Sequence, residues 1–193
     1  MKAQTEHESD QQLAAMAQAG SEAACREILR RYKGFTYRLV YSHVGDADEA
    51  FDLTQEAFVS AFAAIHRYDG ARPFRLWIAR IALNKCRDWA RRRKVRAFFA
   101  RALPLDTAVH VAAEAPPPDR QAGDRAELAR VRAAMAALPP RLREVLLLRG
   151  VEEMSQAEAA ATLGVSQKTV ETRLYRARQQ LRDALDEKQD GGE

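Results

Sequence analysis

The stretch from Ser155 to Arg178, SQAEAAATLGVSQKTVETRLYRAR, decides the fold of the C-terminal part of this chain. Ser155 and Glu158 have the spacing of a capping box, in which two side chains satisfy free N–H groups at the start of a helix. Gly164 can take the left-handed conformation that ends this helix, and Ser166 can cap the next one. Two helices joined by a turn of three or four residues form a helix-turn-helix.

The second helix of this pair has one apolar and one polar face. Its apolar residues recur at spacings of four, three and four, which places them on one buried side: Val170, Leu174, Ala177 and Leu181. The other side presents side chains that can form hydrogen bonds, as a recognition helix does in the major groove: Lys168, Glu171, Thr172, Tyr175 and Arg176. The motif favours DNA binding, and the alternative is a plain helical hairpin with a solvated polar face.

Positive charge is concentrated in one segment of the chain. The whole sequence of 193 residues has a formal net charge of +4. Residues 72–101 alone hold 11 Lys and Arg side chains against one acid, Asp88. Charge gathered in this way is typical of a surface that binds phosphate, and the same segment is also aromatic. A basic helix that merely faces water is the alternative.

The N-terminal half has the apolar periodicity of helices. Two helices are predicted within residues 13–43, and Asp46 has the position of a cap for a third helix that runs to about residue 66. Pro73 suits the first turn of a long helix that reaches about residue 94. One side of this long helix is apolar, whereas its polar side carries Arg80, Asn84, Arg87 and Arg91.

The middle of the chain separates two helical regions. Residues 95–123 lose helical periodicity and contain four prolines, so they are predicted to form a flexible linker. A chain of about 30 residues spans on the order of 100 Å when extended, so it could hold two domains far apart. The sequence therefore predicts an all-α fold of two small helical domains, at 1–94 and 124–187, with a disordered tail at 188–193.

Several classes of function are disfavoured by the composition. Cys25 and Cys86 lie far apart with no metal-ligand spacing nearby, so neither a disulfide framework nor a metal site is expected. The sequence has no Gly-rich phosphate loop, no G-x-S-x-G nucleophile elbow and no metal-ligand spacing, so we expect neither an enzyme nor a cofactor. The polar N-terminus has no signal-peptide pattern and no apolar segment approaches the length of a membrane span, so we expect a cytoplasmic protein without membrane insertion.

Taken together, the segments resemble the small two-domain sigma factors of bacterial RNA polymerase, known as the extracytoplasmic-function (ECF) type of the sigma-70 family. In the C-terminal part the resemblance runs through LPPRLREVLLLRGVEEMSQAEAAATLGVSQKTVETRLYRARQQLR, residues 138–182. In the N-terminal part it is carried by DLTQEAFVSAF, residues 52–62, and by FRLWIARIALNKCRDWARRR, residues 74–93. The order and spacing of these segments are far more specific than any one of them.

The resemblance implies a role for the first domain at the −10 promoter element. In this family that domain helps to open the duplex and captures an unpaired base in a loop pocket. Here the loop corresponds to residues 68–75, where Tyr68 and Phe74 would offer aromatic faces for stacking. The basic side of the long helix would contact the same DNA through Arg80, Asn84, Arg87 and Arg91. Trp77, on the apolar side, is expected in the core.

The resemblance also implies two further surfaces. The exposed face with Asp52, Gln55 and Glu56 corresponds to the family surface that docks on the clamp helices of the largest polymerase subunit. The second domain would contact the polymerase flap and read the −35 element through Lys168, Glu171, Thr172, Tyr175 and Arg176. Many members carry Lys or Arg where this chain has Glu171. Because a carboxylate can accept a hydrogen bond from cytosine N4, we hypothesise that Glu171 selects a cytosine.

The resemblance thus implies an alternative sigma factor that binds core RNA polymerase, directs it to specific promoters and is controlled by an anti-sigma factor. Two other readings stay open. A sigma-like adaptor would sequester an anti-sigma factor without engaging promoters, but it would not need the basic helix. An ordinary helix-turn-helix repressor would leave the basic segment and the acidic docking face unexplained.

Overall fold

The computed structural model describes residues 2–102 and 121–190. Every regular element within these residues is helical, which confirms the predicted all-α fold. The α-helices are α1(Lys2–Gln18), α2(Glu22–Val44), α3(Ala47–Ala63), α4(Phe74–Ala102), α5(Gln121–Ala137), α6(Pro140–Leu146), α7(Gln156–Leu163) and α8(Gln167–Asp190). A 3-10 turn, η1(Ile65–Arg67), precedes the loop before α4, and a π-helical turn, η2(Leu147–Val151), follows α6.

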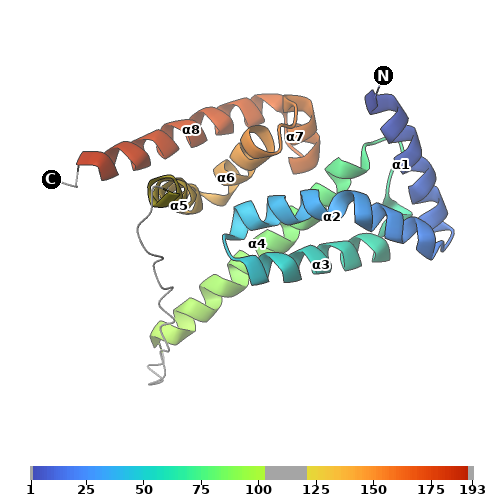
Figure 1. Ribbon diagram of the computed structural model, residues 1–193, viewed down its shortest axis with the longest axis horizontal. Helices are drawn as coiled ribbons and strands as arrows, with labels where there is room; N and C mark the ends of the chain where they lie inside the picture. Colours follow the sequence, from blue (N-terminus) through green and yellow to red (C-terminus); the bar gives the residue numbers. More distant parts are fainter. Residues whose placement is uncertain (1, 103–120, 191–193) are drawn as a thin grey trace.

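The first domain consists of α1 to α4, and local capping signals set its helix boundaries. Ser21 starts α2 by accepting a hydrogen bond from the N–H of Ala24, at 3.3 Å. Gly45 ends α2 in the left-handed conformation, with φ of 78°, where a residue with a Cβ would be strained. Asp46 then caps α3 through the N–H of Glu49, at 2.9 Å. Helices α2, α3 and α4 pack side by side around buried aliphatic side chains, with α1 across one end (Figure 1).

The second domain consists of α5 to α8 and contains the predicted helix-turn-helix. Ser155 accepts from the N–H of Glu158 at 3.2 Å, and the Glu158 carboxylate accepts from the N–H of Ser155 at 2.7 Å, so the capping box is present. Gly164 ends α7 with φ of 67°. Ser166 accepts from the N–H of Thr169 at 3.1 Å and caps α8. Three residues therefore separate the two helices, as the spacing predicted.

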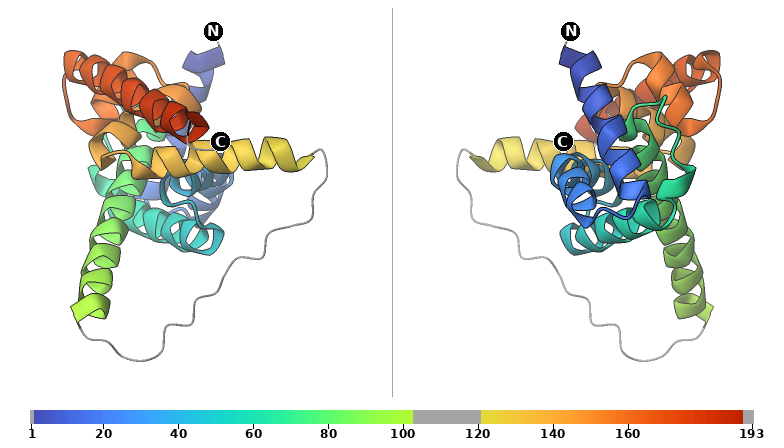
Figure 2. Two further views of the ribbon diagram at one scale, coloured as in Figure 1. Left: turned by 90° about the vertical axis from the view of Figure 1, so that its left-hand side faces the viewer. Right: turned by 90° about the vertical axis from the view of Figure 1, so that its right-hand side faces the viewer.

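The helices next to the predicted linker are longer than the sequence periodicity indicated. Helix α4 runs on to Ala102, eight residues past the expected boundary, and its far end projects from the body of the molecule (Figure 2). No Gly or Pro interrupts residues 95–102, so nothing stops the helix although the apolar stripe has ended. On the other side α5 starts at Gln121, and residues 103–120 lie outside the described part of the chain.

At the C-terminus, α8 continues to Asp190 rather than ending near residue 187. The first three residues of the predicted disordered tail are therefore helical, and residues 191–193 lie outside the described part. Charged residues with good helix propensity, and no Gly before residue 191, allow this extension.

The two domains pack against each other, whereas the linker length would allow wide separation. Helix α7 lies against α4, and the buried side chains of both domains form one continuous apolar core. At the end of α2, Arg143 donates to the backbone carbonyl of His43, with an Nη1 to O distance of 3.1 Å. Nearby, the guanidinium of Arg132 lies 5.4 Å from the centre of the Tyr41 ring. The side of α4 that faces α6 and α7 is thus partly covered by the second domain.

Candidate nucleic-acid interface

The loop between η1 and α4 is held in a fixed turn by its own side chains. The hydroxyl of Tyr68 donates to the backbone carbonyl of Arg72. One carboxylate oxygen of Asp69 accepts from the N–H of Ala71 at 3.0 Å, and the other lies 3.4 Å from Nε of Arg72. Burial raises the pKa of Tyr68 to about 12, so its hydroxyl remains a hydrogen-bond donor at neutral pH.

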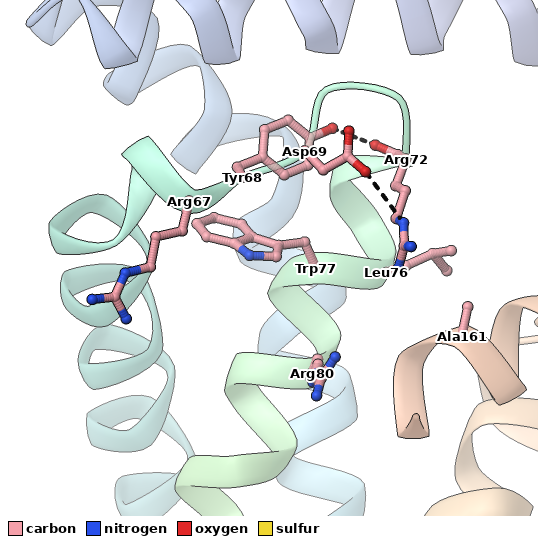
Figure 3. A pocket seen from close by; sticks show the side chains of 8 residues that line it. All are labelled: Arg67, Tyr68, Asp69, Arg72, Leu76, Trp77, Arg80 and Ala161. Atoms are coloured by element: carbon pink, nitrogen blue, oxygen red, sulfur yellow. Dashed lines mark hydrogen bonds and ion pairs between the residues drawn. The ribbon is translucent and has the colours of Figure 1, made fainter. Parts of the chain in front are cut away.

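A cavity of about 330 Å³ lies between this loop, the start of α4 and α7 (Figure 3). Its walls combine two aromatic residues with three arginines, and the second domain closes it on one side through Ala161. The lining residues are Arg67, Tyr68, Asp69, Arg72, Leu76, Trp77, Arg80 and Ala161. Trp77 is only partly buried, and its ring lies beneath the loop beside Tyr68, with centroids 5.2 Å apart. The prediction that Trp77 lies in the core is therefore only partly right.

The expected stacking role of Tyr68 and Phe74 disagrees with this structure. Phe74 is 1% exposed and Tyr68 is 5% exposed. Their rings, together with Tyr32, form an aromatic cluster with centroids about 5 Å apart, in which Phe74 is packed against both neighbours. Phe74, in the first turn of α4, fills the junction between helices. The sequence alone could not distinguish a buried aromatic ring at this position from an exposed one. The rings of Tyr68 and Phe74 pack beneath the loop and support it instead of facing solvent.

The basic side of α4 is exposed at three of its four predicted positions. Arg80, Asn84 and Arg91 face solvent, and Arg91 forms an ion pair with Asp88 one turn back. Arg87 is half-buried instead. Its Nε and Nη2 atoms each lie 2.6 Å from a carboxylate oxygen of Glu144, on α6 of the second domain. The hydrogen bonds to Glu144 raise the pKa of the Arg87 guanidinium.

Arg87 also organises its own helix. Its Nη1 atom donates to the side-chain oxygen of Asn84, at 2.9 Å, so the orientation of this asparagine depends on the arginine. The predicted reading face of α4 is therefore connected, through one side chain, to a buried acid of the other domain. The sequence did not predict a role for Glu144, because its partner Arg87 lies 57 residues away along the chain.

A second pair joins the start of α4 to the end of η2. Nη2 of Arg75 lies 2.6 Å from the backbone carbonyl oxygen of Glu152 and 3.4 Å from its carboxylate. The same guanidinium lies 4.6 Å from the centre of the Phe35 ring. Burial raises the pKa of the Glu152 carboxyl, although the positive charges of Arg38 and Arg75 oppose this shift. Glu152 was likewise not predicted as a functional residue.

Helix α8, the predicted recognition helix, presents its predicted polar face to solvent. Lys168, Glu171, Thr172, Tyr175 and Arg176 are all exposed, and the ring of Tyr175 has 69% of its surface accessible. Nζ of Lys168 lies 3.0 Å from the Glu171 carboxylate, and the Thr172 hydroxyl donates to the backbone carbonyl of Lys168 at 2.9 Å. A shallow cavity of about 410 Å³ runs along this face between α8, Arg149 and Gln156.

The predicted docking face on α3 is also exposed. Asp52, Gln55 and Glu56 all face solvent, and the neighbouring Val59 has 69% of its surface accessible. Nζ of Lys85 lies 3.6 Å from the Glu56 carboxylate, which explains how a lysine is accommodated beside the apolar stripe of α4. An acidic face with an exposed aliphatic side chain suits a basic helical partner.

Three further observations concern a reactive thiol, a metal site and a membrane span. Cys86 is fully buried and burial raises the pKa of its thiol to about 12, so it behaves as a small apolar residue in the core of the first domain. Among the described residues, His, Cys, Asp and Glu nowhere gather in a group of three suited to a metal ion. None of the helices in the described part of the chain has the length and apolar character that a membrane span requires.

Comparison with known proteins places these surfaces in a family. The sigma-70 region 2 family matches residues 28–96, and the sigma-70 region 4 family matches residues 128–181. RNA polymerase sigma factor CnrH of Cupriavidus metallidurans is 40% identical over 182 residues, which cover 93% of this chain and 95% of CnrH. ECF RNA polymerase sigma factor SigW of Bacillus subtilis is 31% identical over 86% of this chain and 91% of SigW. This chain belongs to the ECF sigma factors.

Solved structures agree with this placement. The structure of CnrH in complex with the cytosolic domain of CnrY has a TM-score of 0.68 with this ECF sigma factor, at 34% identity, and the match covers 92% of this chain and 97% of CnrH. The sigma factor RpoE in complex with the anti-sigma factor NepR, from Bartonella quintana, has a TM-score of 0.63. At 22% identity, RpoE supports the shared fold alone. The two-domain arrangement of this sigma factor, with α2 to α4 in region 2 and α5 to α8 in region 4, is that of its family.

Proposed function

We propose that this ECF sigma factor binds core RNA polymerase and directs it to promoters that carry two separate elements. The observation that carries the proposal is the presence in one chain of two separate surfaces suited to DNA, the basic side of α4 and the exposed polar face of α8. An ordinary repressor needs only the second surface, whereas a promoter reader needs both.

The first surface suits the −10 element. The cavity below the loop offers the partly exposed ring of Trp77 and the guanidinium groups of Arg67 and Arg72, a combination that fits an unpaired base and its phosphate. Arg80, Asn84, Arg87 and Arg91 continue from this cavity along α4 and would follow the DNA backbone. Tyr68 and Phe74 are proposed to set the shape of the loop rather than to stack on a base.

The second surface suits duplex DNA at the −35 element. Tyr175 and Arg176 extend from the exposed side of α8 and would contact phosphates or base edges in the major groove. Glu171 is proposed to accept a hydrogen bond from cytosine N4. Lys168, which holds the Glu171 carboxylate at 3.0 Å in the free protein, would reduce the repulsion between this carboxylate and nearby phosphates.

The face with Asp52, Gln55 and Glu56 is the proposed contact with the clamp helices of the largest polymerase subunit, and the second domain is the proposed contact with the flap. CnrH was solved with the cytosolic domain of CnrY, and the likeness to CnrH supports control of this chain by an anti-sigma factor. We propose that the protein acts in the cytoplasm by positioning DNA, and that it has no catalytic residue, metal or cofactor of its own.

Run-off transcription with core polymerase over a genomic promoter library tests this function. The expected result is a small set of transcripts that require the protein. Asn84→Ala should abolish these transcripts. Asn84→Asp, which adds a negative charge at the same position, should reduce transcription at least as much. A protein that yields no dependent transcript, yet binds core polymerase or a CnrY-like peptide, would support the adaptor that only sequesters an anti-sigma factor.

A further inference from the structure

A cavity of about 550 Å³ lies between α4 of the first domain and α6 and α8 of the second. Among the described residues that line this interdomain cavity, Glu144 is the one acid. Three helices that are distant in the sequence bring like charges together around one space, although like charges repel each other. The cationic side chains that line it are Arg87, Arg91 and Lys94 on α4, Arg141 on α6 and Arg173 on α8.

These cations are only partly neutralised by acids of the protein. Arg87 binds Glu144 through two hydrogen bonds of 2.6 Å, and Arg91 forms an ion pair with Asp88 on its own helix. The other three form no ion pair within the described part of the chain: Lys94, Arg141 and Arg173. The interdomain cavity therefore keeps an excess of positive charge that an anion could offset.

A buried histidine at the wall of the interdomain cavity also lacks a partner. His43 lines the cavity and is 4% exposed, and the structure gives its Nδ1 atom no hydrogen bond. Burial, with the positive charges of Arg143 and Arg87, lowers its pKa to about 4, so the ring is neutral at neutral pH. A neutral imidazole that carries its hydrogen on Nδ1 can still donate to an oxygen atom. This unpartnered nitrogen is a second, independent observation that points to a polar ligand at this wall.

The remaining part of the wall is apolar. Leu163 at the end of α7 and Val165 in the turn after it line the interdomain cavity together with Ala90 of α4, and all three pack against the apolar core. Sites for small molecules commonly combine an apolar lining with a few polar groups, in a volume of roughly 300–1,000 Å³. The interdomain cavity has both the size and the mixed lining of such a site.

We propose that the interdomain cavity binds a small ligand with a diphosphate group, held by Lys94, Arg141 and Arg173. A diphosphate carries enough negative charge to offset these three cations, and a guanidinium binds phosphate oxygens through pairs of N–H groups. A nucleoside diphosphate would add a base for the apolar wall, whereas free pyrophosphate would use the cations alone. The diphosphate group is common to both sources.

The site is separate from the proposed −35 surface and does not depend on the proposed function. Arg173 is partly buried, whereas the predicted recognition residues of α8 are exposed. Because the three cations come from both domains, binding should raise the melting temperature of the whole protein in proportion to ligand concentration and affinity.

Isothermal titration calorimetry of the full chain, in magnesium-free buffer, tests the site with pyrophosphate, ADP and adenosine. One molecule of pyrophosphate or of ADP should bind to each chain, and adenosine, which has no phosphate, should not bind detectably. Tighter binding of ADP than of pyrophosphate would support the site with a nucleotide as its ligand. Equal binding of the two would support the site with the diphosphate alone as the recognised group.

The double variant Arg141→Gln/Arg173→Gln removes the two unpaired cations that the second domain contributes. It should bind pyrophosphate and ADP about tenfold more weakly or worse, because two hydrogen-bonded charges are lost. The control Arg26→Gln/Arg182→Gln makes the same change in net charge at two exposed positions on α2 and α8, outside the cavity, and should bind as the wild type does. Circular dichroism establishes that both variants are folded, and Lys94→Gln serves as a milder substitution if the first variant unfolds.

Equal affinities of the two double variants for pyrophosphate and ADP would overturn the site, because the anions would then respond only to the net charge of the chain. Absence of binding to the wild type would overturn it too. So would binding of adenosine as tight as that of ADP, since the cations would then play no part.

Discussion

At the scale of single residues, Glu171 and His43 lead to separate expectations. Glu171 is exposed on the recognition helix and paired with Lys168, so its carboxylate is positioned and accessible at once. His43 is the opposite case, since it is buried at the domain boundary and the structure gives its Nδ1 atom no hydrogen-bond partner. Glu171 therefore concerns the DNA sequence preference, and His43 concerns the stability of the folded state.

We expect Glu171 to set a base preference at the −35 element. Substitution by Gln replaces a group that only accepts hydrogen bonds with one that also donates, so the preference should shift from cytosine toward adenine, whose edge a carboxamide can bind in two places. Selection from promoters randomised in the −35 element measures this shift, which should amount to about 1 kcal/mol or more in discrimination. An unchanged preferred sequence for Glu171→Gln and for Glu171→Ala would refute the assignment.

His43 should make the folded state less stable in mild acid. Burial, with the positive charges of Arg143 and Arg87, lowers its pKa to about 4, although Glu144 lies close by with the opposite charge. The unfolded chain has the ordinary pKa of about 6.5 and binds the proton first, so stability is full above this pH and declines as the pH falls toward 4.

The decline attributed to His43 should total roughly 3 kcal/mol, the free energy that corresponds to this difference in pKa. Urea unfolding at several pH values between 7 and 4 measures it. The variant His43→Gln, which cannot be protonated, should show a flatter profile over the same range. Parallel profiles for the two proteins would show that His43 does not contribute.

At the scale of elements, local signals set the positions of helices more firmly than their lengths. The capping box of Ser155 and Glu158, the left-handed Gly164 and the cap at Ser166 lie within twelve residues, and all of them form as their sequence pattern predicts. The sequence pattern predicts the far end of α4 eight residues too early, because the apolar stripe ends near residue 94 whereas the helix continues to Ala102. An exposed segment can stay helical without an apolar face where neither Gly nor Pro interrupts it, as in residues 95–102.

The capping box should contribute measurably to the second domain. Ser155→Ala removes the acceptor for the Glu158 N–H and should destabilise the protein by about 1 kcal/mol, whereas Ser155→Asp keeps an acceptor and should cost much less. Thermal unfolding followed by circular dichroism compares the two variants. If both lowered the melting temperature equally, the cap would not be the source of the effect.

For the molecule as a whole, the sequence predicts most of the exposed polar positions on α4 and α8 but not the contacts between the two domains. The periodicity of α4 and α8 indicates which side chains face solvent, because each helix is regular and one of its sides is apolar. The contacts of Arg87 with Glu144 and of Arg75 with Glu152 join residues 57 and 77 positions apart, and no local pattern encodes them. The burial of Tyr68 and Phe74 depends in the same way on the packing of α1 and α2 around them.

Promoter recognition by this sigma factor should require both surfaces at once, the basic side of α4 and the polar face of α8. Transcription in vitro from the promoters found in the library measures this directly, with one variant for each domain: Asn84→Ala on α4 and Tyr175→Ala on α8. Each substitution alone should reduce promoter-dependent transcription by about tenfold or more, while both variant proteins still bind core polymerase. Full transcription by either variant, from promoters that require the protein, would contradict it.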